Sequence, residues 1–154
     1  MITTAHEDSP TLRFDATRDA GLARLAAFAP HAGAAYQARR NYDLTASGAG
    51  AVSQLSPWLR HRLISEEEVL TTVLRHHSPQ AAMSYVQEVF WRGYFKGWLE
   101  QRPGVWSSAQ SQQPPLKGAQ KTVYAQAVAG ETGIACFDHW CESLKRAGYL
   151  HNHA

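Results

Sequence analysis

Two serines in the segment AVSQLSPW, residues 51–58, are spaced so that both could bind an anion. Ser56 stands directly before Pro57, so we predict that Ser56 caps a helix beginning at Trp58. The free amides of such a helix and the hydroxyls of Ser53 and Ser56 would face one way, which suits a phosphate group. Because a serine before a proline is also an ordinary helix cap, the segment alone leaves both interpretations open.

A second segment with chemical potential is VFWRGYFKGWLE, residues 89–100, which combines aromatic and basic side chains. Its rings could line a cavity for a phosphate-bearing cofactor with a large flat ring system. Plain packing of a hydrophobic core explains the same aromatic residues. Only the other segments of the chain can distinguish a cofactor cavity from ordinary core packing.

Composition limits the class of protein. The chain has 154 residues, 44% hydrophobic and 18% charged, which is typical of one globular domain with a core. A formal net charge of +2 is too small to indicate nucleic-acid binding by itself. The chain has no uncharged apolar run long enough to cross a membrane, and its first residues do not resemble a secretory signal. We therefore expect a cytoplasmic protein.

Cysteine and histidine spacing indicates neither a redox motif nor a metal site. Cys136 and Cys141 do not form a C-x-x-C pair, so we expect them to be reduced, buried and structural. His151 and His153 lack a nearby carboxylate or thiol, which makes them a poor metal site. No metal is expected.

Helix signals recur along the chain while strand signals are scarce, so the predicted fold class is all-α. We expect a flexible leader over residues 1–17 and a domain over 18–154. A short helix should stop at Pro30 and a second should run through Tyr36. Ser65 and Glu68 form a predicted capping box for a helix that reaches about His76.

Pro79 opens the longest predicted helix, over 79–101, which presents one apolar face made of Met83, Val86, Phe90, Tyr94 and Trp98. The Ser-, Gln- and Pro-rich residues 107–120 are expected to form an extended loop. Thr132 is the expected cap of a last helix, which should stop at Gly148. The residues of that helix expected to face inward are Ile134, Phe137, Trp140, Cys141 and Leu144.

Several segments recur in one order along the chain: Tyr36 with Arg39-Arg40-Asn41, VSQLSP, EVFWRGYFKGW, AGETG, FDHW and AGYLHN. Taken together, this series resembles the helical FAD-binding domain of the DNA photolyase and cryptochrome family. The resemblance runs from about Leu22 to the last residue and implies the amino-terminal half of that domain. The family's α/β antenna domain has no counterpart in this sequence.

The resemblance implies an FAD site built from separate segments. The phosphates would be held by Val52, Ser53, Gln54, Leu55 and Ser56. The residues expected beside the cofactor are Tyr36, Glu88, Trp91 and Asn152. Lesion-bearing DNA would be contacted by Arg60, Arg62, Arg92, Lys96 and His151, although a solvated helix face explains the Arg and Lys residues equally well.

Four positions depart from the family pattern. Val52 replaces a threonine and removes one hydroxyl from the phosphate segment, a loss for which backbone amides can compensate. Gly93 stands where dimer-repairing members carry an acidic residue that contacts the lesion. Ala127 replaces the outermost tryptophan of an electron-transfer chain, and Tyr149 replaces a tryptophan in the closing turn.

The function implied by the resemblance is light-driven repair of pyrimidine lesions in DNA, as in deoxyribodipyrimidine photo-lyase. The alternatives are a cryptochrome-type photoreceptor that does not repair DNA, and an inactive fragment that binds no cofactor. We expect this chain alone to be inactive in repair. Without the remaining helices of such a domain, apolar side chains would be exposed and would favour self-association, among them some of Trp91, Trp98, Phe137 and Trp140.

Overall fold

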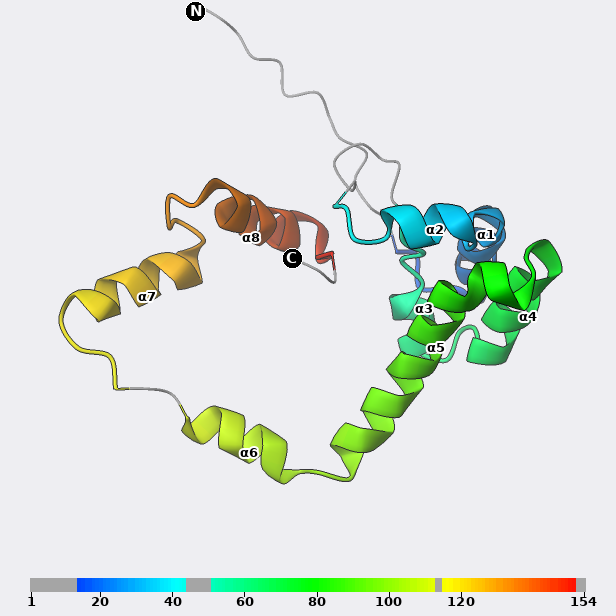
Figure 1. Ribbon diagram of the computed structural model, residues 1–154. Helices are drawn as coiled ribbons and strands as arrows, with labels where there is room; N and C mark the ends of the chain where they lie inside the picture. Colours follow the sequence, from blue (N-terminus) through cyan, green and yellow to red (C-terminus); the bar gives the residue numbers. More distant parts are fainter. Residues whose placement is uncertain (1–13, 44–50, 113–114, 152–154) are drawn as a thin grey trace, which may run out of the picture. The chain divides into compact units, whose positions relative to one another are not determined.

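The computed structural model describes residues 14–43, 51–112 and 115–151, which form helices joined by turns (Figure 1). Within these ranges there is no strand, so the predicted all-α class is confirmed. The chain divides near Tyr94 into two compact units. None of the described helices is long and apolar enough to cross a membrane.

In its described residues the first unit contains five α-helices, the last of which continues into the second unit, and one 3₁₀ turn. Their bounds are α1 Arg18–Phe28, η1 Ala29–His31, α2 Ala34–Arg39, α3 Ser56–Arg60, α4 Glu66–His76 and α5 Pro79–Glu100. The predicted stop before Pro30, the helix through Tyr36 and the start of α5 at Pro79 are confirmed. The predicted capping box is also confirmed, because Ser65 Oγ accepts from the Glu68 amide and the Glu68 carboxylate accepts from the Ser65 amide.

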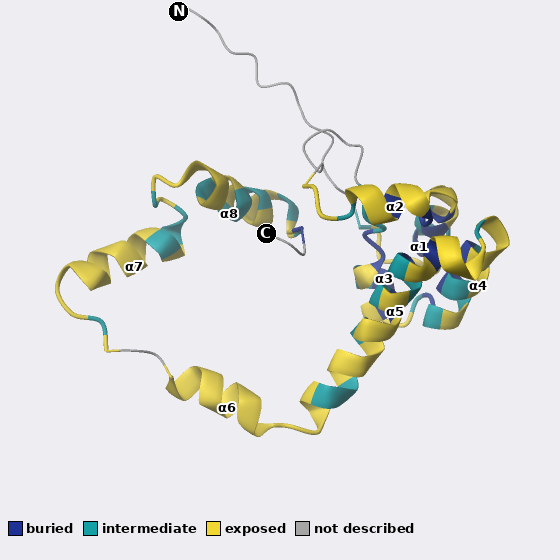
Figure 2. Ribbon diagram, in the orientation of Figure 1, coloured by how far each residue is buried: buried dark blue, intermediate teal, exposed yellow. Residues whose placement is uncertain are grey.

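One hydrophobic core lies in the first unit, and Figure 2 shows the buried residues gathered on its helices. The core draws on α1, η1, α2, α3, α4 and the first half of α5. Its buried members are Leu25, Phe28, Ala29, Ala32, Tyr36, Leu55, Trp58, Leu59, Ile64, Val69, Val73, Ala82, Tyr85 and Val89.

The face that α5 turns to this core differs from the predicted one. Ala82, Tyr85 and Val89 are buried, whereas Met83 and Phe90 of the predicted face are exposed. Apolar side chains occupy two neighbouring faces of this helix, so periodicity alone did not select between them. Ala82 is fully buried, so the selected face combines this small side chain with Tyr85 and Val89.

The described part of the second unit holds the end of α5 and three further helices, α6 Gly104–Ser111, α7 Ala119–Ala129 and α8 Ala135–Ala147. The prediction of an extended loop over 107–120 was wrong, because its first residues belong to α6. Serine and glutamine reduce helix propensity only slightly, and the strong helix breakers of this stretch, Pro114 and Pro115, come after α6. The helix α7 was not predicted.

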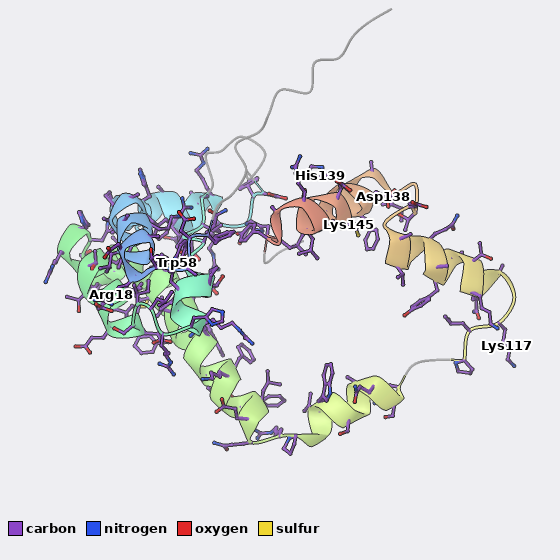
Figure 3. All side chains as sticks on the ribbon, turned by 180° about the vertical axis from the view of Figure 1, so that it is seen from behind. Arg18, Trp58, Lys117, Asp138, His139 and Lys145 are labelled. Carbon is purple, nitrogen blue, oxygen red and sulfur yellow. The ribbon has the colours of Figure 1, made fainter. Side chains whose placement is uncertain are left out.

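Asp138, which is labelled in Figure 3, organises the start of α8. Its carboxylate accepts hydrogen bonds from the Thr132 amide at 2.8 Å, the Thr132 hydroxyl at 2.7 Å and the Gly133 amide at 2.8 Å. The Thr132 backbone hydrogen bond is the main reason that the pKa of Asp138 lies below its usual value. Thr132 therefore stabilises the turn before α8. The prediction that Thr132 is the helix cap was wrong, because the cap position falls at Ile134. Gly148, at φ 64°, ends α8 as predicted.

The side chains of α8 are less buried than predicted. Ile134, Phe137 and Leu144 are exposed, and α8 has no buried residue. Cys136 is exposed and Cys141 is half-buried, so the prediction of buried cysteines was wrong, while both thiols are free as expected. The physical reason is that the core described above uses helices of the first unit only.

An exposed ion pair joins α1 to α4. Arg18 Nη2 donates to Glu68 Oε1, Arg18 Nη1 donates to Glu68 Oε2 at 3.2 Å, and Nη1 also donates to the Leu63 carbonyl at 2.9 Å. Hydrogen bonding to Arg18 is the largest cause that lowers the pKa of Glu68 from 4.5 to about 2, and the hydrogen bond from the Ser65 amide is the second. Figure 3 labels Arg18 in this unit.

We predict a pH-dependent stability contribution from this pair. Because the folded-state pKa of Glu68 is lowered, the contribution is present above about pH 4.5 and is lost as the pH falls toward 2. In an NMR titration, Arg18→Gln should raise the pKa of the Glu68 carboxyl toward its ordinary value. Arg75→Gln, at an exposed position of α4, is the control and should leave that pKa near 2. An unchanged Glu68 pKa in Arg18→Gln would contradict the assignment.

Candidate cofactor site

The predicted phosphate segment is anchored in the core by Leu55. Leu55 is almost fully buried, Val52 packs against the core, and Ser53 is half-buried. The Leu55 amide donates to Ser53 Oγ at 3.4 Å, a long contact within the segment. Gln54 is buried and has a φ of 56°, in the left-handed region that side-chain-bearing residues rarely adopt.

Arg24 of α1 holds the backbone and a side chain of this segment. Arg24 Nε donates to the Ser53 carbonyl oxygen at 2.9 Å, and Arg24 Nη2 donates to Gln54 Oε1 at 2.6 Å. Arg24 was not among the predicted site residues. Its partners lie in another segment, and neither helix periodicity nor a local motif relates residues so far apart in sequence.

Two tyrosines pack beside the same segment. The ring of Tyr85 lies 5.1 Å from Tyr36 and 4.9 Å from Phe28, measured between centroids, and the Tyr36 contact is edge-to-face. Burial raises the pKa of the Tyr85 phenol to about 12, and a hydrogen bond with Ser53 opposes that shift. Tyr85 therefore connects predicted residues of α2 and of the phosphate segment, although it was not predicted as a site residue.

Arg40 connects Tyr36 to Glu88. Arg40 Nη1 donates to Glu88 Oε1, and the guanidinium carbon lies 6.0 Å from the centre of the Tyr36 ring. Burial acts to lower the pKa of Arg40, but hydrogen bonds to Glu88 and Tyr36 outweigh burial and raise it. The charge of Glu88 is thus matched by a cation at the site.

These contacts define a group of residues that we call the tyrosine cluster. Of the predicted cofactor residues it contains Tyr36, Ser53, Gln54 and Glu88, which come from α2, the 52–56 segment and α5. The structure adds three residues to them. The whole cluster consists of Arg24, Tyr36, Arg40, Ser53, Gln54, Tyr85 and Glu88.

The prediction that Ser56 caps α3 was wrong. The cap position is Leu55, and Ser56 is the first residue of the helix with an exposed side chain. No side-chain hydrogen bond caps α3, which has only five residues. Because burial of Leu55 fixes where the segment turns into the helix, Ser56 lies one position too late to act as the cap.

Other predicted site residues are not among those that define the tyrosine cluster. Trp91 is 50% exposed and packs edge-to-face on Tyr94 with 5.5 Å between ring centroids. Arg60 is exposed at the end of α3, whereas His151 of the second unit is buried. Asn152 lies outside the described residues. The assigned roles of these four residues stay predictions.

The remaining basic candidates form ion pairs. Arg92 Nη1 lies 2.7 Å from Glu66 Oε1, Arg62 Nη1 lies 3.6 Å from Glu66 Oε2, and Lys96 Nζ lies 3.6 Å from Glu100 Oε1. Surface pairs of this kind contribute only about 0–1 kcal/mol. Exchange of such a carboxylate for a phosphate would therefore cost little.

Comparisons of the chain with models of known protein families, with curated proteins and with solved structures give no match. Within the described part of the chain, no group of three metal-ligating side chains is close enough to hold an ion. The chemistry offered by the tyrosine cluster is therefore that of two arginines, a serine hydroxyl and buried phenols. Arginine and serine side chains are groups that bind anions, and the two buried phenols pack on each other and on Phe28.

Proposed function

We propose that this chain contributes to an FAD site of photolyase or cryptochrome type. In this proposal the 52–56 segment holds the cofactor phosphates, while Tyr36, Glu88 and Trp91 lie beside the cofactor. The observation that carries the proposal is that Tyr36, Ser53 and Glu88, chosen from separate parts of the sequence, belong to one cluster. Arg24 supplies positive charge beside the 52–56 segment, as a diphosphate requires, whereas the charge of Arg40 is matched by Glu88.

Bound FAD would supply the redox chemistry, which is light-driven electron transfer to a pyrimidine lesion in DNA. The protein residues would bind and orient the cofactor, and Arg60, Arg62, Arg92 and Lys96 remain the proposed contacts to DNA. A photoreceptor without repair activity is the second candidate. Gly93 favours it, because an exposed glycine offers no acidic contact to a lesion.

Self-association is part of the same proposal. Phe90, Trp91, Phe95 and Leu99 of α5 are exposed, and Phe137 of α8 is exposed as well. Large apolar side chains along one helix form an exposed apolar patch, and proteins usually cover such a patch with another element or partner. A further element of an FAD-binding domain, or a second copy of the chain, would provide that cover.

The first experiment measures the visible flavin absorbance of the purified chain after incubation with FAD and desalting. We expect a retained flavin band. Ser53→Ala should weaken FAD binding by about tenfold or more, because a hydrogen bond to a charged ligand is lost. Tyr85→Phe removes only the phenol hydroxyl and leaves the serine for the ligand, so it should retain FAD.

Ser107→Ala, at an exposed position of α6, is the control for the serine substitution and should bind FAD like the wild-type chain. Absence of a flavin band in the wild-type chain would overturn the proposal. If FAD is retained, reversal of pyrimidine lesions under near-UV or blue light separates a repair enzyme from a photoreceptor.

A further inference from the structure

We propose that Arg24 is the positioning residue of the 52–56 segment. Its guanidinium holds Ser53 and Gln54 in the conformation that the proposed phosphate site requires. The identity of the ligand rests on the proposed function, whereas the effect of Arg24 on the segment rests on contacts within the chain.

The geometry of the contact is that of a two-point clamp. Arg24 uses two different nitrogens, Nε on the Ser53 carbonyl and Nη2 on the Gln54 side chain, at 2.9 and 2.6 Å. Because the guanidinium is planar and rigid, these two bonds fix the backbone at 53 and the side chain at 54 relative to each other. A lysine carries the same charge but has no such fork.

The conformation held by this clamp is one that the segment would not adopt freely. Gln54 has a φ of 56°, a backbone conformation that is disfavoured by about tenfold or more for residues other than glycine. Gln54 is also buried, so the oxygen of its side-chain amide needs a hydrogen-bond donor. Arg24 supplies that donor, and Leu55 holds the next residue in the core. Removing the clamp should release Ser53, whose hydroxyl is proposed to bind the phosphates.

This role predicts a selective effect on ligands. FAD carries a diphosphate and riboflavin carries none, so a residue that positions the phosphate segment should matter for FAD alone. A residue that only stabilises the fold would affect both ligands alike. The comparison of the two flavins therefore separates positioning from general stability.

The test measures dissociation constants of FAD and riboflavin for the full chain and its variants. Arg24→Ala and Arg24→Lys should each weaken FAD about tenfold and leave riboflavin binding within about twofold of the wild-type value. Gln54→Gly removes the energetic penalty of the positive φ at this position. Adding Arg24→Ala to Gln54→Gly should therefore weaken FAD binding by less than about threefold. Arg75→Ala, which removes an exposed arginine of α4, should change neither constant. Wild-type FAD affinity in Arg24→Lys, or equal losses for both flavins in Arg24→Ala, would overturn the proposal.

A second measurement keeps this inference separate from the proposed function. If the wild-type chain binds neither flavin, the FAD proposal fails, and hydrogen exchange still reports on the clamp. Arg24→Ala should accelerate exchange of the Leu55 amide about tenfold relative to the wild type, and Arg75→Ala should not. Equal exchange rates in Arg24→Ala and the wild type would show that Arg24 does not position the segment.

Discussion

Replacing Tyr85 by alanine is expected to lower the free energy of unfolding of the first unit by about 3–5 kcal/mol. The Tyr85 side chain is 3% exposed and its ring packs on Phe28 and Tyr36, so its removal leaves a cavity between α1, α2 and α5. The hydrogen bond with Ser53 is lost as well. Urea denaturation followed by circular dichroism would measure the change.

Two variants control this experiment. Tyr85→Phe keeps the ring and removes only the hydroxyl, so it should cost about 1 kcal/mol. Tyr42→Ala removes an exposed tyrosine of the same unit and should change the free energy of unfolding by less than about 0.5 kcal/mol. If Tyr85→Ala lowers the free energy of unfolding by less than about 1 kcal/mol, the rings of Phe28, Tyr36 and Tyr85 do not form the centre of the unit.

The second prediction concerns Gly21 of α1, which packs against Trp58. A Cβ atom at position 21 would lie 2.9 Å from two atoms of the Trp58 ring and 3.2 Å from Ile64 Cγ2. Both side chains are buried, and Trp58 Nε1 donates to the Asp15 carbonyl oxygen at 3.0 Å, so the ring has little room to move. Gly21→Ala should therefore destabilise the unit by about 1–2 kcal/mol, although alanine is the better helix former.

Gly93→Ala is the matched control for this substitution, because Gly93 also lies within a helix but has open space where a Cβ atom would be added. No neighbouring atom lies within 4 Å of that position. Only the helix propensity changes there, so the variant should be more stable by up to about 1 kcal/mol. The two substitutions thus have opposite signs in the same denaturation experiment. A stabilising Gly21→Ala would contradict the close packing of α1 on Trp58.

The candidate site was predictable only in part. Tyr36, Ser53, Gln54 and Glu88 were selected from segments of the sequence and lie in one cluster. Arg24, Arg40 and Tyr85, which join them, were not predicted as site residues. Their side chains contact residues of other helices or segments, and such contacts leave no periodic pattern in the sequence.

Local signals account for the helices that were predicted correctly. The capping box of α4, the proline at the start of α5 and the glycine after α8 act within one helical turn, so the neighbouring residues alone determine them. One error occurred where composition replaced such a signal, whereas the wrong caps at Ser56 and Thr132 came from local signals themselves. The serine-rich start of residues 107–120 contains no proline or glycine, and it is helical.

The sequence by itself determined the all-α class, the end of α1 and the starts of α4 and α5, because capping and helix propensity depend on adjacent residues. Only the tertiary structure decided which face of α5 is buried and which cations meet the 52–56 segment and Glu88. Both outcomes depend on the packing of distant segments. Ala82 and Tyr85 are selected over Met83 and Phe90 by the shape of the surface they meet, a property that no single helix carries.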